Sequence, residues 1–352
     1  MYLIYIFLIY VAVVILLTAL LLLGNSQFGY LGRMADYFFN VLPGNLLSLL
    51  PNFIKTRALM FYNYITSTRN RFFTAMYLII ISCLAIQFHL EVVPFTIALS
   101  KASKNPAEQT YIVNRSLFGY ILFMFNLACW IVCVWKDPGF IDSKNHGQLY
   151  IYNEFDNCLY KKDVMCQTCK LPKPARSKHC SFCNRCVYRM DHHCVYINNC
   201  VGGMNLFYFH LFIISLLAGA WYGAYAYFCL LRDYLRLTNL WWHKYTDSHG
   251  VIQSTNWVVL FKHVVFTYPR IAFSLAVFFI FAMGITLFYF YHVYLVAVGK
   301  TTNESFKISQ LSPDKAEKYK TRNLYNRGLL LNFLEIYNPY FAFRTRRRFK
   351  CD

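Results

Sequence analysis

Long hydrophobic stretches alternate with polar segments along this chain. Five of them are long enough to cross a bilayer, because a spanning helix needs about 20 mainly apolar residues. None shows the two-residue alternation of a membrane barrel strand, so the pattern predicts helices. The five predicted spans are Tyr2–Leu23, Phe72–Val93, Leu117–Trp135, Leu206–Leu231 and Ile271–Val298.

The first stretch could also be read as a cleaved signal peptide. It has no basic start, and no small-residue cleavage site precedes Asn25, so we expect a retained anchor. The predicted fold class is therefore an all-α multi-pass membrane protein with five transmembrane helices.

Composition agrees with this prediction. Hydrophobic residues make up 57% of the chain and charged residues 14%, whereas a soluble domain carries about 25% charged residues. Aromatic residues reach 19%, which excludes an intrinsically disordered chain.

The basic residues give an orientation. The net charge is +19, and 27 of the 35 Lys and Arg residues fall in segments 24–71, 136–205 and 299–352. Five spans place these segments on one side, which the positive-inside rule makes cytosolic. The N-terminus and the loops 94–116 and 232–270 are then luminal. The predicted organisation is spans one to three in 1–135, a cytosolic domain in 136–205, spans four and five in 206–298, and a cytosolic tail in 299–352.

Seven of the thirteen cysteines cluster within the most basic predicted cytosolic loop, interleaved with histidines. Disulfides are disfavoured in the reducing cytosol, and repeated CxxC spacing is typical of tetrahedral zinc sites. We identify no internal repeat. The ten candidate ligands are Cys166, Cys169, His179, Cys180, Cys183, Cys186, His192, His193, Cys194 and Cys200.

Two tetrahedral sites would use eight of these ten residues. If each site is Cys₃His, one cysteine and one histidine remain, the pair that thiol catalysis requires. Asp191, beside the histidines, would orient the base. Spacing does not choose the remaining pair. A purely structural zinc module, or one that binds partners or nucleic acid, is the main alternative, although no basic helix flanks the cluster. A RING-type ubiquitin ligase would need wider spacing between ligand pairs.

The segment from Cys166 to Cys200 resembles the cysteine-rich domain of the DHHC-type protein S-acyltransferases, the palmitoyltransferases. The resemblance is greatest to the five-pass animal subgroup numbered four and to the fungal enzyme named for spore wall formation. It continues through four further motifs, namely Asp137-Pro138-Gly139, Val201-Gly202-Gly203-Met204-Asn205, Thr301-Thr302-Asn303-Glu304, and the spaced residues Gly328, Asn332 and Tyr337.

This resemblance implies two structural zinc ions and a catalytic dyad. It assigns His192 as the base and Cys194 as the nucleophile, with Asp191 orienting the base. Cys194 would take palmitate from palmitoyl-coenzyme A and pass it to cysteines of membrane-associated proteins. Thr302, Glu304, Asn332 and Asp137 would support the site. The implied zinc ligands are Cys166, Cys169, His179 and Cys186 for one ion, and Cys180, Cys183, His193 and Cys200 for the other.

The remaining expectations concern ligands and location. The basic side chains of Arg176, Lys178, Arg185 and Arg189 are expected to contact the coenzyme A phosphates. The resemblance also implies an acyl-chain cavity between the helices, contact with membrane lipid, no nucleic-acid partner, and residence in the endoplasmic reticulum or Golgi. Val195-Tyr196 replaces the Pro-Trp pair usual in the family. We expect His89, Glu91, His210 and His292 to lie at membrane interfaces, and the basic segment 344–352 to face lipid.

Overall fold

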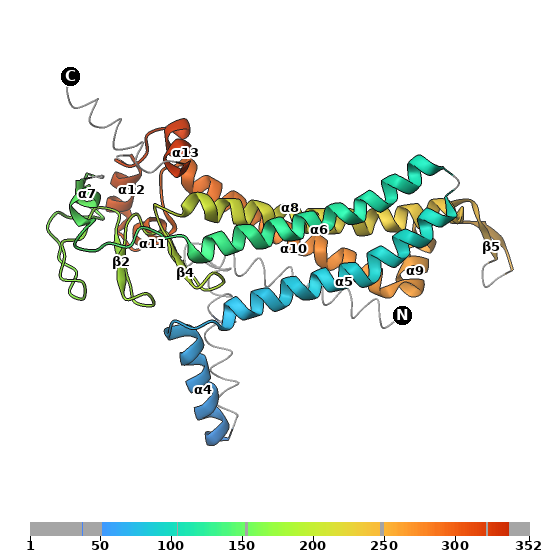
Figure 1. The fold of residues 1–352 in the computed structure, drawn as a ribbon, viewed down its shortest axis with the longest axis horizontal. Coiled ribbons are helices and arrows are strands. Elements are labelled where there is room, and N and C mark those ends of the chain that lie inside the picture. Colours follow the sequence, from blue (N-terminus) through green and yellow to red (C-terminus); the bar gives the residue numbers. More distant parts are fainter. Residues whose placement is uncertain are drawn as a thin grey trace. The chain divides into compact units, whose positions relative to one another are not determined.

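The computed structural model of the protein describes residues 37, 51–103, 105–151, 154–246, 250–321 and 323–337. The predicted first span and the basic segment 344–352 lie outside these residues. The helices are α4 (Asn52–Ser67), α5 (Phe72–Ala102), α6 (Pro106–Trp135), α7 (His146–Ile151), α8 (Leu206–Leu237), η2 (Leu240–Trp242), α9 (Trp257–Thr267), α10 (Pro269–Ala297), α11 (Thr302–Ser309), α12 (Pro313–Thr321) and α13 (Leu329–Tyr337) (Figure 1).

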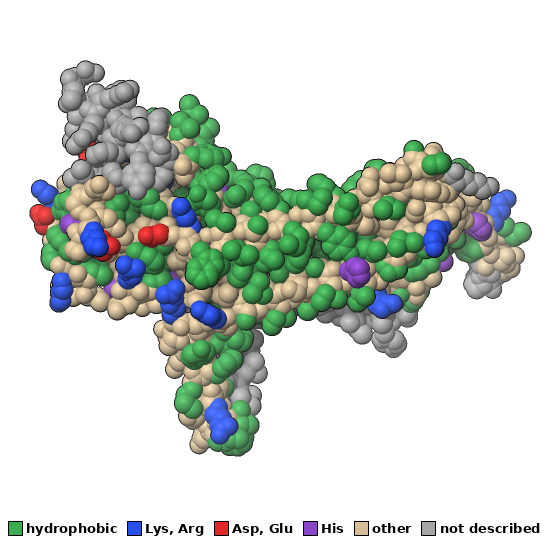
Figure 2. Space-filling model, in the orientation of Figure 1, with side chains coloured by type: hydrophobic (Ala, Val, Ile, Leu, Met, Phe, Trp, Pro, Cys, Tyr) green, Lys and Arg blue, Asp and Glu red, His purple; other side chains and the backbone are tan. Residues whose placement is uncertain are grey.

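Within the described residues, four helices are long and apolar enough to cross a membrane. They contain the predicted second, third and fourth spans and all of the fifth except Val298, and their apolar character indicates a membrane protein. Hydrophobic side chains dominate the visible surface of these helices (Figure 2). The candidate spans are Phe72–Ala102, Gln109–Trp135, Leu206–Leu237 and Pro269–Ala297.

The chain divides into two compact units that cut across the long helices. We call the first the helical unit and the second the cysteine-rich unit. The helical unit comprises Met1–Gly24, Ile79–Leu127 and Ile214–Leu287. The cysteine-rich unit comprises Asn25–Leu78, Ala128–Ile213 and Phe288–Asp352.

Apolar packing forms the core of the helical unit. Phe88 of α5, Tyr227 of α8 and Phe278 of α10 belong to one buried cluster. In a bilayer such side chains hold helices together through van der Waals packing, because lipid tails are as apolar as the side chains themselves. Gly223 lets α8 and α10 approach closely, because a Cβ there would lie 2.2 Å from the Phe278 ring.

A buried ion pair joins α6 to α8. Arg115 of α6 forms a buried ion pair with Asp233 of α8 at 2.9 Å. This pair lies outside the apolar runs that we used to predict the spans, yet both residues are helical. The helices therefore extend beyond their hydrophobic runs, because the two charges neutralise each other away from water.

A hairpin and a short helix follow α8 in the helical unit. Strands β5 (Lys244–Thr246) and β6 (Ile252–Ser254) pair antiparallel. Helix α9 then begins after Asn256, whose side chain accepts hydrogen bonds from two backbone N–H groups of its first turn. Such an N-cap satisfies donors that have no partner within the helix.

Between α6 and α8, the described residues of the cysteine-rich unit form one short helix, α7, and two antiparallel hairpins. Strands β1 (Lys178–Cys180) and β2 (Arg185–Val187) form the first hairpin. Strands β3 (His192–Cys194) and β4 (Asn199–Val201) form the second. Hairpins this short are at best marginally stable alone, so other contacts must hold them.

Candidate active site and metal centres

The two hairpins gather the cysteines and histidines into two separate clusters. In the first, the Nδ1 atom of His179 lies 3.4–3.9 Å from three sulfur atoms. In the second, Nδ1 of His193 lies 3.5–3.6 Å from three others. The clusters are Cys166, Cys169, His179 and Cys186, and Cys180, Cys183, His193 and Cys200, with all ligand atoms of each within 4.8 Å of one another.

Each cluster has the donor set and spacing that a zinc ion requires. Three sulfurs and one imidazole nitrogen form a typical structural zinc site. Separations of 3.4–3.9 Å correspond to the edges of a tetrahedron with bonds of about 2.0–2.3 Å. Both clusters could therefore bind zinc, and the ion would hold the hairpins in shape.

The two sets share one spacing, which we missed in the sequence. In each set the histidine lies 13 and 10 residues after the two cysteines of the CxxC pair and 7 residues before the last cysteine. Our prediction of no internal repeat was therefore wrong at this scale. Because the second set begins before the first one ends, the two copies interleave and are hard to see.

Strand geometry separates the predicted catalytic pair from the residues of the second cluster. In β3, His193 opposes Cys200 of β4, and both belong to the second cluster. Successive side chains of a strand point to opposite faces, so His192 and Cys194 share the face away from that cluster. This alternation leaves one histidine and one cysteine available for catalysis.

Asp191 fixes the orientation of His192. One carboxylate oxygen, Oδ2, accepts a hydrogen bond from His192 Nδ1 at 2.6 Å. Thr302 donates to the same carboxylate through its backbone N–H at 2.7 Å and its hydroxyl at 2.8 Å. Burial disfavours the charged carboxylate, but these hydrogen bonds and the charge of His192 outweigh it and lower the pKa of Asp191.

The imidazole of His192 links Asp191 to Cys194. Burial lowers the pKa of His192, but hydrogen bonds to Asp191 and to the Cys194 thiol outweigh burial and raise the pKa to about 10. The thiol itself is buried, with 9% of its residue surface exposed. A buried thiol beside an oriented imidazole is the arrangement of an activated cysteine nucleophile.

Three side chains hold the loop that follows Cys194. Thr74 donates to the Val195 carbonyl at 3.3 Å, and the Trp130 indole donates to the Tyr196 carbonyl at 3.2 Å. Arg69 donates to the Asn198 carbonyl at 3.2 Å. The unusual Val195-Tyr196 pair therefore lies in a loop that is braced from α5, from α6 and from the residues before α5.

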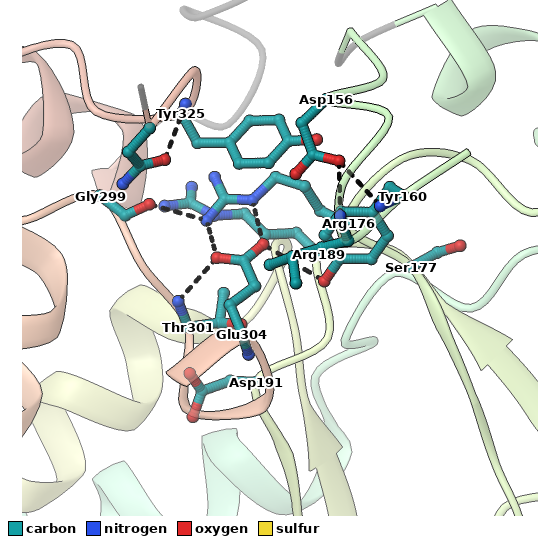
Figure 3. Close-up of polar contacts among 12 residues, drawn as sticks. Asp156, Tyr160, Arg176, Ser177, Arg189, Asp191, Gly299, Thr301, Glu304 and Tyr325 are labelled. Carbon is teal, nitrogen blue, oxygen red and sulfur yellow. Dashed lines mark hydrogen bonds and ion pairs between the residues drawn. The ribbon is translucent and has the colours of Figure 1, made fainter. Parts of the chain in front are cut away.

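The Thr301–Glu304 motif after α10 holds the carboxylate of Asp191 in place. Thr301 and Glu304 form a capping box at the start of α11, which places Thr302 against Asp191. Figure 3 shows Glu304 facing the guanidinium group of Arg176, with the Tyr325 ring above that group. The Arg176–Glu304 pair is bidentate, at 2.7 Å for both bonds, and the two side chains are 1% and 0% exposed.

Asn332 and Asp137 form hydrogen bonds with nearby backbone groups. Asn332 of α13 is fully buried and donates to the Ala297 carbonyl at 2.9 Å, so it fixes the end of α10 shortly before Thr301. Asp137 accepts from the Gly139 and Phe140 N–H groups after α6. Gly202 must lack a side chain here, because a Cβ would lie 2.5 Å from a neighbouring carbonyl oxygen.

Two of the four basic residues expected at coenzyme A phosphates are occupied elsewhere. Arg176 and Arg189 are 1% and 2% exposed, and they pair with Glu304 and Glu335. Their charges are already neutralised inside the protein, so neither side chain is available to contact phosphate. The two others, Lys178 and Arg185, are exposed. The guanidinium of Arg185 lies over the Phe140 ring.

His210 and His292, which we expect at membrane interfaces, are buried among other residues of the cysteine-rich unit, at 7% and 4% exposure. The His292 ring centroid lies 6.0 Å from that of His192, and Phe209 packs against both rings. Ionisable residues within spans are functional candidates, and the position of His292 beside His192 makes it one here.

Comparisons with known proteins match the part of the chain that carries both clusters. The family model described as DHHC palmitoyltransferase matches residues 159–309. Palmitoyltransferase ZDHHC4 of Bos taurus is 29% identical over 353 residues, covering 97% of this chain and 98% of that protein. The Mus musculus protein of the same name is 31% identical, and the match covers 63% of this chain and 68% of that protein. Palmitoyltransferase SWF1 of Neurospora crassa is 32% identical, and the match covers 59% of this chain and 51% of that protein.

Proposed function

The chain belongs to the DHHC palmitoyltransferase family, and on this premise we propose that Cys194 carries the acyl group between an acyl-coenzyme A donor and a protein thiol. The protein is a membrane-bound protein S-palmitoyltransferase. The observation that carries the proposal is that Cys194 and His192 share the face of β3 opposite His193 and belong to neither Cys₃His cluster.

We propose two linked half-reactions. In the first, His192 takes the proton of the Cys194 thiol, and the thiolate attacks the thioester carbon of palmitoyl-coenzyme A. The bond from this carbon to the coenzyme A sulfur breaks, and the departing thiolate takes the proton from His192. In the second half-reaction, a substrate cysteine gives its proton to His192 and attacks the Cys194 thioester, and Cys194 leaves as the thiol.

The environment of the dyad supports this cycle. Asp191 carries a negative charge beside the imidazolium that forms in each half-reaction, and Thr302 holds the carboxylate in place. One thioester replaces another, so no nucleotide is consumed. Zinc in the two clusters would be structural, because three cysteines and a histidine fill a tetrahedral site and leave no open position.

We further propose one site for an acyl chain and, separately, two candidates for contact with phosphate. The helical unit contains an apolar cavity of about 80 Å³ among α5, α6, α8 and α10, lined in part by Phe88, Gly119 and Phe278. This cavity is suited to part of an acyl chain, whose burial contributes about 0.8 kcal/mol per CH₂. The exposed Lys178 and Arg185 remain candidates for contact with phosphate.

The placement of the protein in the cell is also a proposal. The basic residues favour a cytosolic cysteine-rich domain and C-terminus with a luminal N-terminus, in the endoplasmic reticulum or Golgi. Substrates would be proteins with cysteines near the membrane surface. Protease protection of epitope tags at the two ends tests the orientation, and equal accessibility of both ends from the cytosol would contradict it.

Labelled palmitoyl-coenzyme A tests the proposed nucleophile. Purified wild-type enzyme should acquire one hydroxylamine-sensitive label per chain, and Cys194→Ser should acquire none. The matched control is Cys158→Ala, which removes an exposed cysteine outside both clusters and should label normally. Continued labelling of Cys194→Ser at the wild-type level would overturn the mechanism.

A further inference from the structure

The C-terminal end of α6 is bound by a side chain from the second hairpin. The last carbonyl groups of a helix have no partner within the helix, and α6 ends where a candidate membrane span also ends. The side-chain amide of Asn199 in β4 donates to three carbonyl oxygens at this end. They belong to Cys133, Val134 and Lys136, at 3.3, 3.3 and 2.9 Å.

Asn199 also lies directly opposite the proposed nucleophile. It pairs with Cys194 of β3 across the hairpin, and its side-chain oxygen accepts a hydrogen bond from the Cys200 N–H at 2.9 Å. Opposite residues of antiparallel strands have Cα atoms about 4.5–5.5 Å apart. Because Asn199 is 6% exposed, water does not compete for its partners. The attachment of Asn199 to α6 therefore also fixes the backbone at Cys194.

A second hydrogen bond joins α6 to the same hairpin. The Trp130 indole donates to the carbonyl of Tyr196, which lies in the loop between β3 and β4, at 3.2 Å. Trp130 is itself buried and stacks on the ring of Tyr77 in α5. All of these residues belong to the cysteine-rich unit. Within that unit, α6 holds the hairpin at two points.

We propose that Asn199 is a positioning residue for acyl transfer, which holds the backbone of Cys194 in a fixed place against the end of α6. This role rests on the proposed function, because it requires that Cys194 takes the acyl group. A thiolate attacks only from close to the thioester carbon, and a displacement of about 1 Å lowers the rate about a hundredfold. Asp191 orients the base His192, whereas Asn199 sets the place of the nucleophile relative to a membrane span.

The two polar atoms of the Asn199 side chain can be tested separately. Asn199→Asp keeps the oxygen that accepts from Cys200 and replaces the amide N–H groups with a second oxygen. That oxygen brings a negative charge to three carbonyl groups at the negative end of the α6 dipole. The substitution should therefore release the hairpin from α6 and leave the bond to Cys200 in place.

Two reactions of purified full-length enzyme distinguish positioning from activation of the thiol. For Asn199→Asp, the maximal rate of Cys194 acylation by palmitoyl-coenzyme A should fall roughly tenfold to hundredfold, as expected when buried acceptors lose their donor. The concentration that gives half the maximal rate should change little. Iodoacetamide is small and requires only the activated thiol, so its rate of reaction with Cys194, followed by peptide mass mapping, should match wild type. The zinc content should also match.

Two further variants provide controls. Asn184→Asp makes the same substitution at an exposed position in the turn between β1 and β2, and it should acylate as wild type does. Trp130→Phe removes the indole N–H but keeps an aromatic ring. It should give a smaller loss of the same kind, with normal alkylation. Added to Asn199→Asp, it should cause little further loss, because the hairpin is already released from α6.

Five outcomes would overturn the proposal. They are wild-type acylation in Asn199→Asp, an equal loss in Asn184→Asp, a matching loss of alkylation, a full further loss in the double variant, and loss of zinc from Asn199→Asp. The last would mean that Asn199 supports the metal cluster through Cys200 rather than the place of Cys194. A wild-type enzyme that takes no acyl group at Cys194 would instead refute the proposed function, so the two failures are distinguishable.

Discussion

The helical unit and the cysteine-rich unit are stabilised by different forces. Large apolar side chains such as Phe88 and Tyr227 form the core of the helical unit. The hairpins of the cysteine-rich unit are short, and the contacts available to hold them are two Cys₃His clusters that could bind zinc and buried charge pairs such as Arg176–Glu304. Apolar packing has no preferred direction, whereas metal ligands and ion pairs require particular atoms. Single substitutions should therefore have larger effects in the cysteine-rich unit.

Loss of one metal ligand should have the largest effect. Cys186→Ala removes a thiolate from the first cluster, and structural zinc contributes roughly 10–16 kcal/mol of apparent binding free energy in small zinc domains. We expect the zinc content to fall from two ions per chain to one, with complete loss of acyl transfer. Elemental analysis and an activity assay measure both, with the exposed Cys158→Ala as control. Two ions in purified Cys186→Ala would show that the cluster is wrongly assigned.

Breaking the buried ion pair should have the next largest effect. Glu304→Gln leaves the charge of Arg176 buried without a carboxylate, and such a loss costs about 3–5 kcal/mol. Thermal unfolding monitored through zinc release should show a clearly lowered midpoint. Glu317→Gln, at an exposed position of α12, should change stability by no more than about 0.5 kcal/mol. Equal midpoints for the two variants would mean that the pair contributes little.

Thr302 should affect the reaction more than the fold. Thr302→Val removes the hydroxyl group that donates to Asp191, and a hydrogen bond to a charged group contributes about 1.5–3 kcal/mol. If that energy serves to hold Asp191 for catalysis, kcat should fall roughly tenfold to hundredfold while the unfolding midpoint changes little. Thr302→Ser keeps the hydroxyl and should recover most of the activity. A loss in Thr302→Ser as large as in Thr302→Val would point to packing of the methyl group instead.

The smallest effect is expected in the helical unit. Ser215→Ala removes the hydroxyl that accepts from Asn126 at 2.9 Å, and hydrogen bonds between membrane helices contribute about 0.6 kcal/mol on average. Detergent or denaturant titration of α-helical content should barely distinguish this variant from wild type. A loss comparable with that of Glu304→Gln would contradict the contrast between the two units.

The two units also differ in how far their sequences predict them. Four of the five predicted spans are helices in the described residues, because hydrophobicity is a local property of each segment. The ends were less predictable. Arg115 lies in the extension of α6 and pairs with Asp233, 118 residues away, and no local pattern reveals such a partner.

In the cysteine-rich unit, the sequence predicted the ligand types and their number. The count of ten candidates did not identify the catalytic pair, and the family resemblance was needed to assign Cys194 and His192. The alternation of side chains along β3 would have separated them from His193, had the strand been predicted. Arg176 was misassigned because its partner Glu304 lies 128 residues away, and an isolated basic residue in a loop is usually solvated.

The central claim is that Cys194 alone among the seven clustered cysteines is off the metal and takes the acyl group. The most direct measurement is a brief reaction with palmitoyl-coenzyme A, followed by peptide mass mapping of the trapped thioester and a zinc count on the same sample. We predict one palmitoyl group, located on Cys194, in protein that holds two zinc ions. A palmitoyl group on any of the six proposed ligand cysteines, or acylation accompanied by loss of zinc, would contradict this account.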